Sequence, residues 1–531
     1  MLNTARATNA MAVAPHHLAA QSALAVMRDG GNAIEAMIAA AATIAVVYPH
    51  MNGIGGDSFW LVVPPEGEPS AIDACGAAAR AATIEAYRSR GHIAIPIRGP
   101  LAANTVAGTI GGWHEAQRLA AERGGVQSTA RLLRDAIDYA SDGVAVTESQ
   151  QRSTAAKFAE LASQPGYSET FLIDGRLPVA GERFKQPRMA ATLQQLAAEG
   201  LESFYRGRLA TRIAEDLSAV GSLVSWEDLA ANYATRKTPL HVEHSQGRLF
   251  NMTPPTQGVV SLAILGVLDR VGLASVAADS ADHVHLVVEA TKQAFKLRDQ
   301  FVTDPAEMKV APQSLLASKR LDDMAANIDP MHAAAWGSGR GPGDTIWMGV
   351  VDSSGVAVSF IQSIYHEFGS GVVLPSTGIN WQNRGASFSL DANALLALRP
   401  GKKPFHTLNP AAARLNDGRT MVYGTMGGDG QPQTQAAVFT RYVVFGQRLQ
   451  AAITAPRWLL GRTWGQSTET LKLENRFPDA VVTELMRRGH DVELLLPFDE
   501  TMGHAGAIVR HPDGTLEGAS DPRSDGGVAA C

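Results

Sequence analysis

The sequence changes character within residues 337–352, which read GSGRGPGDTIWMGVVD. The first eight of these residues are rich in glycine and have the composition of a linker. From Thr345 onward apolar residues predominate, and a second apolar run follows at 356–361 after a Ser-Ser-Gly turn. The pattern predicts a β-hairpin whose first strand begins with a threonine directly after a linker.

A second hairpin is expected earlier in the chain, with strands at 58–63 and 71–73 joined by the turn-forming run PPEGEP. Strand patterns return at 241–251. Helical spacing predicts two packed helices within 17–48, a helical layer over 110–235, and helices at 262–271 and 281–298. Strands joined by hairpins and mixed with helices favour a layered fold with antiparallel sheets over alternating βαβ units.

Composition narrows the range of functions. Hydrophobic residues make up 45% of the 531 and charged residues 18%, which argues for a folded chain with a large core. The formal net charge of -6 supplies no broad basic surface, so nucleic acid is not an expected partner. The chain has two cysteines, Cys75 and Cys531, which are too few for a disulfide framework or a cysteine-rich metal site. This low cysteine content fits a protein of a reducing compartment.

The longest apolar run covers residues 36–48 and directly follows Glu35. A membrane-spanning helix needs about 20 apolar residues, so this run predicts a buried, alanine-rich helix instead. The first residues also lack the apolar core of a secretory signal. We therefore expect no membrane partner and a cytoplasmic location.

Thr345 has a chemical possibility that follows from its place after the linker. If the chain were cut before it, this residue would carry both a hydroxyl and a free α-amine. An α-amine has a pKa of about 7.7 to 8.0, so much of it can accept the hydroxyl proton at neutral pH. One residue would then be both nucleophile and general base.

The motifs around Thr345 and elsewhere resemble the γ-glutamyltranspeptidase family of N-terminal-nucleophile hydrolases. The resemblance extends over nearly the whole chain, and the motifs occur in family order. They are Asp29–Ala33, Gly53–Asp57, Pro254–Gly258, Thr345–Asp352, Phe368–Gly371, Ser376–Asn380, Gly424–Gly428 and Gly518–Ser524.

The resemblance implies an α+β fold, a four-layer αββα sandwich of the N-terminal-nucleophile hydrolase type. It implies a precursor that cuts itself before Thr345 into a large chain, 1–344, and a small chain, 345–531, which together form one domain. The new N-terminal threonine would attack an amide carbonyl and form an acyl-enzyme. Gly427 and Gly428 would hold the oxyanion through their N–H groups, and Ser363 would support the threonine.

The sequence departs from the family where glutamyl substrates are bound. Cys75 replaces an expected arginine, Ser387 an aspartate, and Tyr365 an asparagine. His406 and Thr407 replace a pair of serines, and the segment after Phe388 is too short for the family's lid loop. Because a buried charge without a partner costs several kcal/mol, a γ-glutamyl group should bind poorly. The missing lid should favour hydrolysis over transfer.

Arg384, in an Asn-Arg-Gly segment, is the candidate for binding a substrate carboxylate, because a guanidinium pairs with carboxylates through two hydrogen bonds. An alternative is a structural ion pair. Tyr365, His366 and His406 are further candidate donors, whereas Lys402 and Lys403 are expected to form a solvated rim. With its Asn-Arg-Gly segment and no lid loop, the chain resembles the branch of the family that includes enzymes hydrolysing oxamate in purine metabolism.

The expected function is hydrolysis of a small, carboxylate-bearing amide, with oxamate converted to oxalate and ammonia as the best match. A bulky Tyr365 and a short segment around Cys75 suit a small pocket. Three alternatives stay open: a γ-glutamyl hydrolase or transferase, a glutaryl acylase, and an unprocessed inactive homologue. No metal-ligand or phosphate-loop spacing is present, so neither a metal nor a cofactor is expected.

Overall fold

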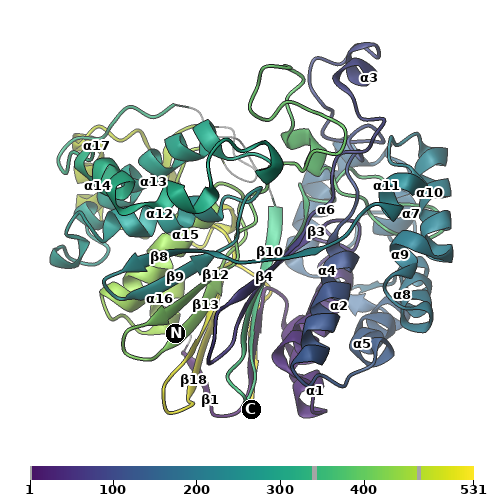
Figure 1. Cartoon of the computed structure of the whole chain (residues 1–531), viewed down its shortest axis with the longest axis horizontal. Helices are drawn as coiled ribbons and strands as arrows, with labels where there is room; N and C mark the ends of the chain where they lie inside the picture. Colours follow the sequence, from purple (N-terminus) through teal and green to yellow (C-terminus); the bar gives the residue numbers. More distant parts are fainter. Residues whose placement is uncertain (1–2, 338–343, 463–467) are drawn as a thin grey trace.

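The computed structural model describes residues 3–337, 344–462 and 468–531. Two seven-stranded sheets stack face to face, with helices on both outer faces, as Figure 1 shows. This is the predicted four-layer αββα sandwich. The predicted linker lies outside the described residues over 338–343.

The sheet that carries Thr345 has the order β19-β2-β10-β11-β3-β4-β7, and all its neighbouring strands are antiparallel. Its strands are β2 (Met11–Ala14), β3 (Asp57–Val63), β4 (Ser70–Ala74), β7 (Thr235–Lys237), β10 (Asp344–Val351), β11 (Ala357–Tyr365) and β19 (Gly527–Ala530). Both predicted hairpins, β3–β4 and β10–β11, are therefore confirmed.

The second sheet has the order β1-β18-β17-β13-β12-β9-β8 and is also antiparallel throughout. Its strands are β1 (Ala5–Ala7), β8 (Leu240–His244), β9 (Gly247–Asn251), β12 (Ala411–Leu415), β13 (Thr420–Gly424), β17 (Gly506–Arg510) and β18 (Leu516–Ser520). Two small sheets lie apart from it, built from β5 (Val144–Ala145), β6 (Arg183–Phe184), β14 (Trp458–Leu460), β15 (Leu471–Glu474) and β16 (Val492–Leu495).

Helices from the first half of the chain cover the sheet that carries Thr345 (Figure 1). They are α1 (His17–Arg28), α2 (Ala33–Val47), α4 (Thr109–Glu122), α5 (Thr129–Asp142), α6 (Glu148–Leu161), α7 (Tyr167–Phe171), α8 (Pro187–Glu199), α9 (Ser203–Arg206), α10 (Arg208–Val220) and α11 (Trp226–Ala230). The short helix α3 (Ile84–Arg88) lies beyond this layer, at the top of the view in Figure 1. The other sheet is covered by α12 (Gly258–Leu268), α13 (Ala281–Phe301), α14 (Ser318–Ala326), α15 (Gly430–Phe439), α16 (Leu449–Thr454) and α17 (Asp479–Arg487). The helix predicted at 262–271 thus begins and ends earlier.

Helix α2 is the alanine-rich run that the sequence predicts to be buried, and every residue of it is buried. Asn32 accepts the N–H groups of Ile34 and Glu35, and Glu35 accepts the Asn32 N–H in return, a capping box that starts the helix. In the part of the chain that the structure describes, none of the helices has both the length and the hydropathy needed to span a bilayer.

Trp347 fixes the distance between the two sheets near Thr345. Its ring packs among apolar side chains of both sheets and lies against Gly424 and Gly506 of the opposite one. A β-carbon at Gly424 would lie only 2.2 Å from Trp347 Cδ1, so that position requires glycine. Because side chains alternate along a strand, the side chain of Thr345 points to the same side as that of Trp347, into the space between the two sheets.

Candidate active site

Thr345 lies at the start of β10, at an irregularity in the sheet. Asp344 is opposite Tyr365, but Ile346 is opposite Gln362, so two residues of β11, Ser363 and Ile364, oppose the single Thr345. Such a β-bulge re-aims the side chains beside it and is common next to active sites. The Thr345 side chain is fully buried.

Ser363 and Tyr365 belong to this bulged end of β11. The Ser363 hydroxyl oxygen accepts the N–H of Tyr365 at 2.8 Å. Tyr365 has φ = +82°, a left-handed conformation that is rare for a residue with a bulky side chain. Backbone of this kind persists only where its surroundings hold it, and it clusters at functional sites. The predicted supporting serine therefore lies across from Thr345 and also holds the turn that positions Tyr365.

Gly427 and Gly428 form the loop between β13 and α15. Their φ values are +114° and +51°, so both positions favour glycine. A β-carbon at Gly427 would approach no atom closer than 3.7 Å, so backbone conformation and not crowding explains that glycine. The Gly428 carbonyl accepts the side-chain N–H of Gln257 at 2.9 Å, which fixes the loop from the side of α12.

Arg384 is the most unusual charged residue of the site. It is only 1% exposed, and within the described part of the chain none of its three guanidinium nitrogens has a hydrogen-bond partner. Its Cζ lies 3.8 Å from the centre of the Tyr365 ring, a cation–π contact. Burial lowers the pKa of this guanidinium to about 10. Five N–H donors are thus held in the interior with a ring on one side and no hydrogen-bond acceptor from the described segments.

The segment that carries Arg384 is attached directly to the bulge. The Asn383 N–H donates to the carbonyl of Ile364 at 3.2 Å, and the Asn383 side chain bonds the His366 N–H at 3.1 Å and the Ile97 carbonyl at 2.9 Å. A β-carbon on Gly385 would lie 1.6 Å from Asn104 Oδ1, so only glycine fits there. The Asn-Arg-Gly segment is therefore a fixed turn that holds Arg384 beside the residues opposite Thr345.

Asp57 and His406 form a buried pair near Arg384. Asp57 Oδ1 accepts the N–H groups of Gly76 at 3.0 Å and Gly108 at 2.9 Å, and Oδ2 lies 3.2 Å from His406 Nε2. Burial raises the pKa of Asp57 to about 7. Burial, and then the charge of Arg384, hold the pKa of His406 well below its usual value. His406 is therefore neutral at pH 7, and the contact is not an ion pair.

The Asp57 pair predicts a pH dependence of stability. Its carboxyl binds a proton more tightly in the folded chain (pKa about 7) than in the unfolded one (3.8), so the free energy of unfolding falls as pH rises through this window. We expect wild type to lose up to about 4 kcal/mol relative to Asp57→Asn between pH 4 and pH 7. Urea unfolding at a series of pH values, in a Thr345→Ala background that stays one chain, measures this difference. Parallel profiles for the two proteins would contradict it.

The other predicted binding residues are placed around this centre. Cys75 is buried near Arg384, and burial raises the pKa of its thiol well above the usual value, so it stays uncharged. The Thr407 carbonyl accepts a 3.0 Å hydrogen bond from the same Gln257 side chain that fixes Gly428. Ser387, by contrast, lines a cavity of about 640 Å³ whose lining does not include Arg384.

The predicted solvated rim of Lys402 and Lys403 is wrong. Lys402 is only 4% exposed and pairs with Glu307 at 2.7 Å, while Lys403 pairs with buried Asp73 at 2.7 Å. Carboxylates distant in sequence draw both ammonium groups inward. Lys403 thereby balances the Asp73 charge close to Cys75.

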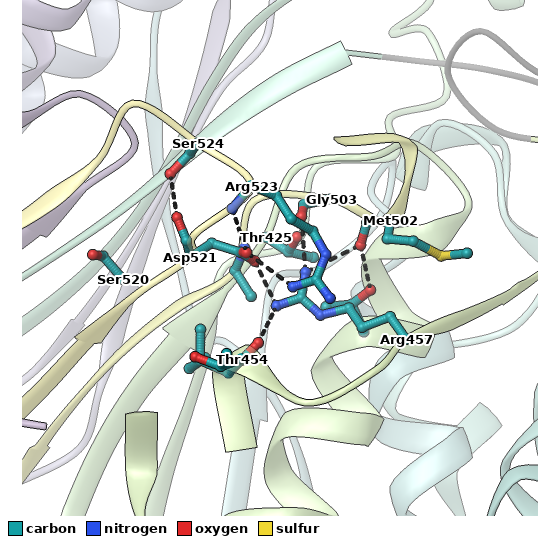
Figure 2. A network of polar contacts seen from close by, with 12 residues as sticks. Thr425, Thr454, Arg457, Met502, Gly503, Ser520, Asp521, Arg523 and Ser524 are labelled. Carbon is teal, nitrogen blue, oxygen red and sulfur yellow. Dashed lines mark hydrogen bonds and ion pairs between the residues drawn. The ribbon is translucent and has the colours of Figure 1, made fainter. Parts of the chain in front are cut away.

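Figure 2 shows the ion network built by the motif at 518–524. Asp521 pairs with Arg457 at 2.5 Å and with Arg523 at 3.0 Å, and all three side chains are buried. Arg457 also donates to the carbonyl of Gly503 at 2.8 Å. Gly503 in turn packs against Gly427. The network therefore supports the loop that carries Gly427 and Gly428.

His285, Glu289 and His490 form a separate buried cluster whose ligand atoms lie within 4.8 Å of one another. The two imidazoles hydrogen-bond at 2.8 Å, and Lys292 donates to Glu289 at 2.7 Å. An ammonium beside the carboxylate opposes a metal ion, and each group already has a partner. We assign this cluster a structural role.

Three residues of the site were not singled out from the sequence: Asp57, Gln257 and Gln431. Asp57 and Gln257 lie within quoted motifs, and Gln431 stands three residues after one, so part of the signal was present. Their partners come from other strands and loops, however, and spacing along the chain does not reveal them. Gln431 follows the glycine loop, and its Nε2 lies 3.4 Å from Thr345 Oγ1.

Comparison with known proteins adds independent evidence. Residues 19–531 match the family described as gamma-glutamyltranspeptidase. The oxamate amidohydrolase proenzyme of Klebsiella pneumoniae is 63% identical over 523 residues, 98% of each chain. The glutathione hydrolase-like YwrD proenzyme of Bacillus subtilis is 39% identical over 520 residues, also 98% of each. The structure of cephalosporin acylase from Bacillus halodurans matches with a TM-score of 0.92 and 34% identity, covering 100% of this chain and 97% of that one.

Proposed function

The chain belongs to the γ-glutamyltranspeptidase family and is an amide hydrolase of the N-terminal-nucleophile type, and from this premise we propose that it hydrolyses oxamate to oxalate and ammonia. One observation carries the choice of substrate: the buried guanidinium of Arg384 has no hydrogen-bond partner among the residues that the structure describes. A buried charge of this kind is costly unless something pairs with it. A substrate carboxylate supplies the missing partner.

Substrate size supports oxamate over longer acids. In oxamate the carboxylate is bonded directly to the scissile carbonyl carbon, so the cation that binds it must lie close to the nucleophile. Asn383, the residue before Arg384, is hydrogen-bonded to Ile364, which opposes Thr345 in the bulge. The relative with 63% identity is itself named for oxamate, which points the same way.

The proposed reaction begins with self-cleavage between Asp344 and Thr345, which yields chains 1–344 and 345–531. The freed α-amine of Thr345 takes the proton from its own hydroxyl as the oxygen attacks the amide carbon. The N–H groups of Gly427 and Gly428 stabilise the oxyanion, and fixed donors of this kind are each worth about 2.7–4 kcal/mol. The C–N bond then breaks, ammonia leaves with the proton from the amine, and an oxalyl ester remains on Thr345.

Water completes the cycle. It attacks the ester carbon, gives its proton to the α-amine, and oxalate leaves as the threonine oxygen regains a proton. Ser363 supports the nucleophile from the opposite strand. We further propose a cytoplasmic enzyme of purine metabolism with no membrane or nucleic-acid partner; its two cysteines are both free thiols, which suits a reducing compartment.

The test compares three amides that all release ammonia: oxamate, glutaramate and glutamine. We expect kcat/KM for oxamate to exceed the others by about 10²-fold or more, because only oxamate places its carboxylate beside the scissile bond. Ammonia release by the purified, cleaved enzyme measures this. A preference for glutamine would favour a γ-glutamyl hydrolase, a preference for glutaramate a glutaryl acylase, and either would overturn the proposal.

A further inference from the structure

Gln431 is a fully buried amide in the first turn of α15, with its Nε2 3.4 Å from Thr345 Oγ1. Its Oε1 is also buried and has no hydrogen-bond partner among the residues that the structure describes. A buried polar atom left unpaired costs about 1–3 kcal/mol. The chain keeps this cost at the candidate nucleophile, which points to a functional use of the amide.

The start of α15 holds this amide in place. The Gln431 N–H donates to the Gly428 carbonyl at 3.2 Å, and the Gly430 N–H donates to the Gly427 carbonyl at 2.7 Å. Asp429, which stands between Gly428 and Gly430 in the chain, pairs with buried Arg298 at 2.8 Å. Gln431 is thus tied to the glycine loop and reaches Thr345 from helix α15, which covers the opposite sheet.

We propose that Gln431 is a catalytic residue whose side-chain N–H stabilises the Thr345 oxygen when the acyl group leaves it. During hydrolysis of the acyl-enzyme, the C–Oγ bond breaks, its electron pair stays on Oγ, and Oγ takes a proton from the α-ammonium of Thr345. Until that proton arrives the oxygen carries negative charge, and an N–H aimed at it lowers the barrier. The inference rests on the proposed function in that it requires an acyl-enzyme on Thr345.

The test replaces Gln431 by glutamate, which keeps the shape, and by methionine, which keeps the length; both lose the N–H donor when the glutamate is ionised. We expect deacylation to slow by about 10²-fold. Formation of the acyl-enzyme is affected far less where breaking of the C–N bond limits it, because Oγ is by then bonded to carbon; kcat and KM therefore fall together and kcat/KM changes only a few-fold. Mass spectrometry of acid-quenched enzyme should find the small chain carrying the acyl group in steady state.

Gln435 provides the matched control. It is a buried glutamine one turn later in α15, and its Nε2 donates to Asn409, at 2.6 Å to the carbonyl and 3.0 Å to Oδ1. Gln435→Met removes the same amide at a distance from Thr345, so it should lower stability without accumulation of acyl-enzyme. The kcat/KM of Gln435→Met divided by that of wild type measures how much a packing defect alone lowers activity.

The outcomes separate this inference from the proposed function. Wild-type turnover of oxamate tests the function, whereas the ratio of variant to wild type, on whichever amide wild type hydrolyses, tests Gln431. Self-cleavage also ends with hydrolysis of an ester on Oγ, a step in which Oγ leaves as it does in deacylation, so uncut but folded Gln431 variants beside a cut Gln435→Met would support the inference. Cut, folded Gln431 variants whose kcat and KM match wild type, or whose kcat/KM falls without acyl-enzyme, would overturn it.

Discussion

Thr345→Ala is expected to remain a single 531-residue chain and to release ammonia from oxamate at least about 10⁴-fold more slowly than wild type. The substitution removes the hydroxyl that makes both attacks, first on the peptide bond before it and later on the substrate. Denaturing gel electrophoresis measures the first effect and ammonia release the second.

Thr345→Ser is the control for this experiment. Serine keeps a hydroxyl on the same carbon, so it should restore cleavage and part of the activity. Both variants should match wild type in far-ultraviolet circular dichroism, since Thr345 is one small residue at the start of β10. A Thr345→Ala protein that is still cut and active would exclude Thr345 as the nucleophile.

Arg384→Met is expected to lower kcat/KM for oxamate by about 10²–10³-fold, the loss that follows when one partner of a buried charge pair is removed. The same change should leave the free energy of unfolding unchanged or higher, because the guanidinium is buried without a hydrogen-bond partner in residues 3–337, 344–462 and 468–531. Kinetics and urea unfolding on the same preparation measure both effects. Lower activity with higher stability is the pattern of a binding residue.

Two controls sharpen the Arg384 experiment. Oxamide replaces the carboxylate by a neutral amide of the same shape, so its hydrolysis should be weak in wild type and little changed in Arg384→Met. Arg384→Lys keeps the charge but loses the two-pronged geometry and should recover only part of the activity. Equal losses on oxamate and oxamide, together with lower stability, would instead make Arg384 a structural residue.

Local sequence signals predicted much of the fold. Turn residues between apolar runs located the β3–β4 and β10–β11 hairpins, and glycines with Asn32 located the break between α1 and α2. The order of the strands could not be predicted in this way. β19 pairs with β2, and β2 pairs with β10, although hundreds of residues separate these strands along the chain. Such pairings depend on the whole packed core.

The site shows the same division. Arg384 and Tyr365 were each predicted as candidate binding residues, and the structure places the two in contact. Lys403 was expected in solvent because a run of charges is usually exposed, yet Asp73 lies 330 positions earlier and pairs with it. The Asp57–His406 pair was missed for the same reason. Partners brought together by different strands leave no spacing signal in the sequence.

The central claim is that Thr345 becomes the N-terminal nucleophile of a cleaved amide hydrolase. The intact mass of the denatured wild-type protein, taken from a preparation that hydrolyses oxamate, tests it most directly. The account predicts two chains, residues 1–344 and 345–531, with Thr345 at the new N-terminus. A preparation that is fully active as one uncut chain, or that is cut at another residue, would contradict it.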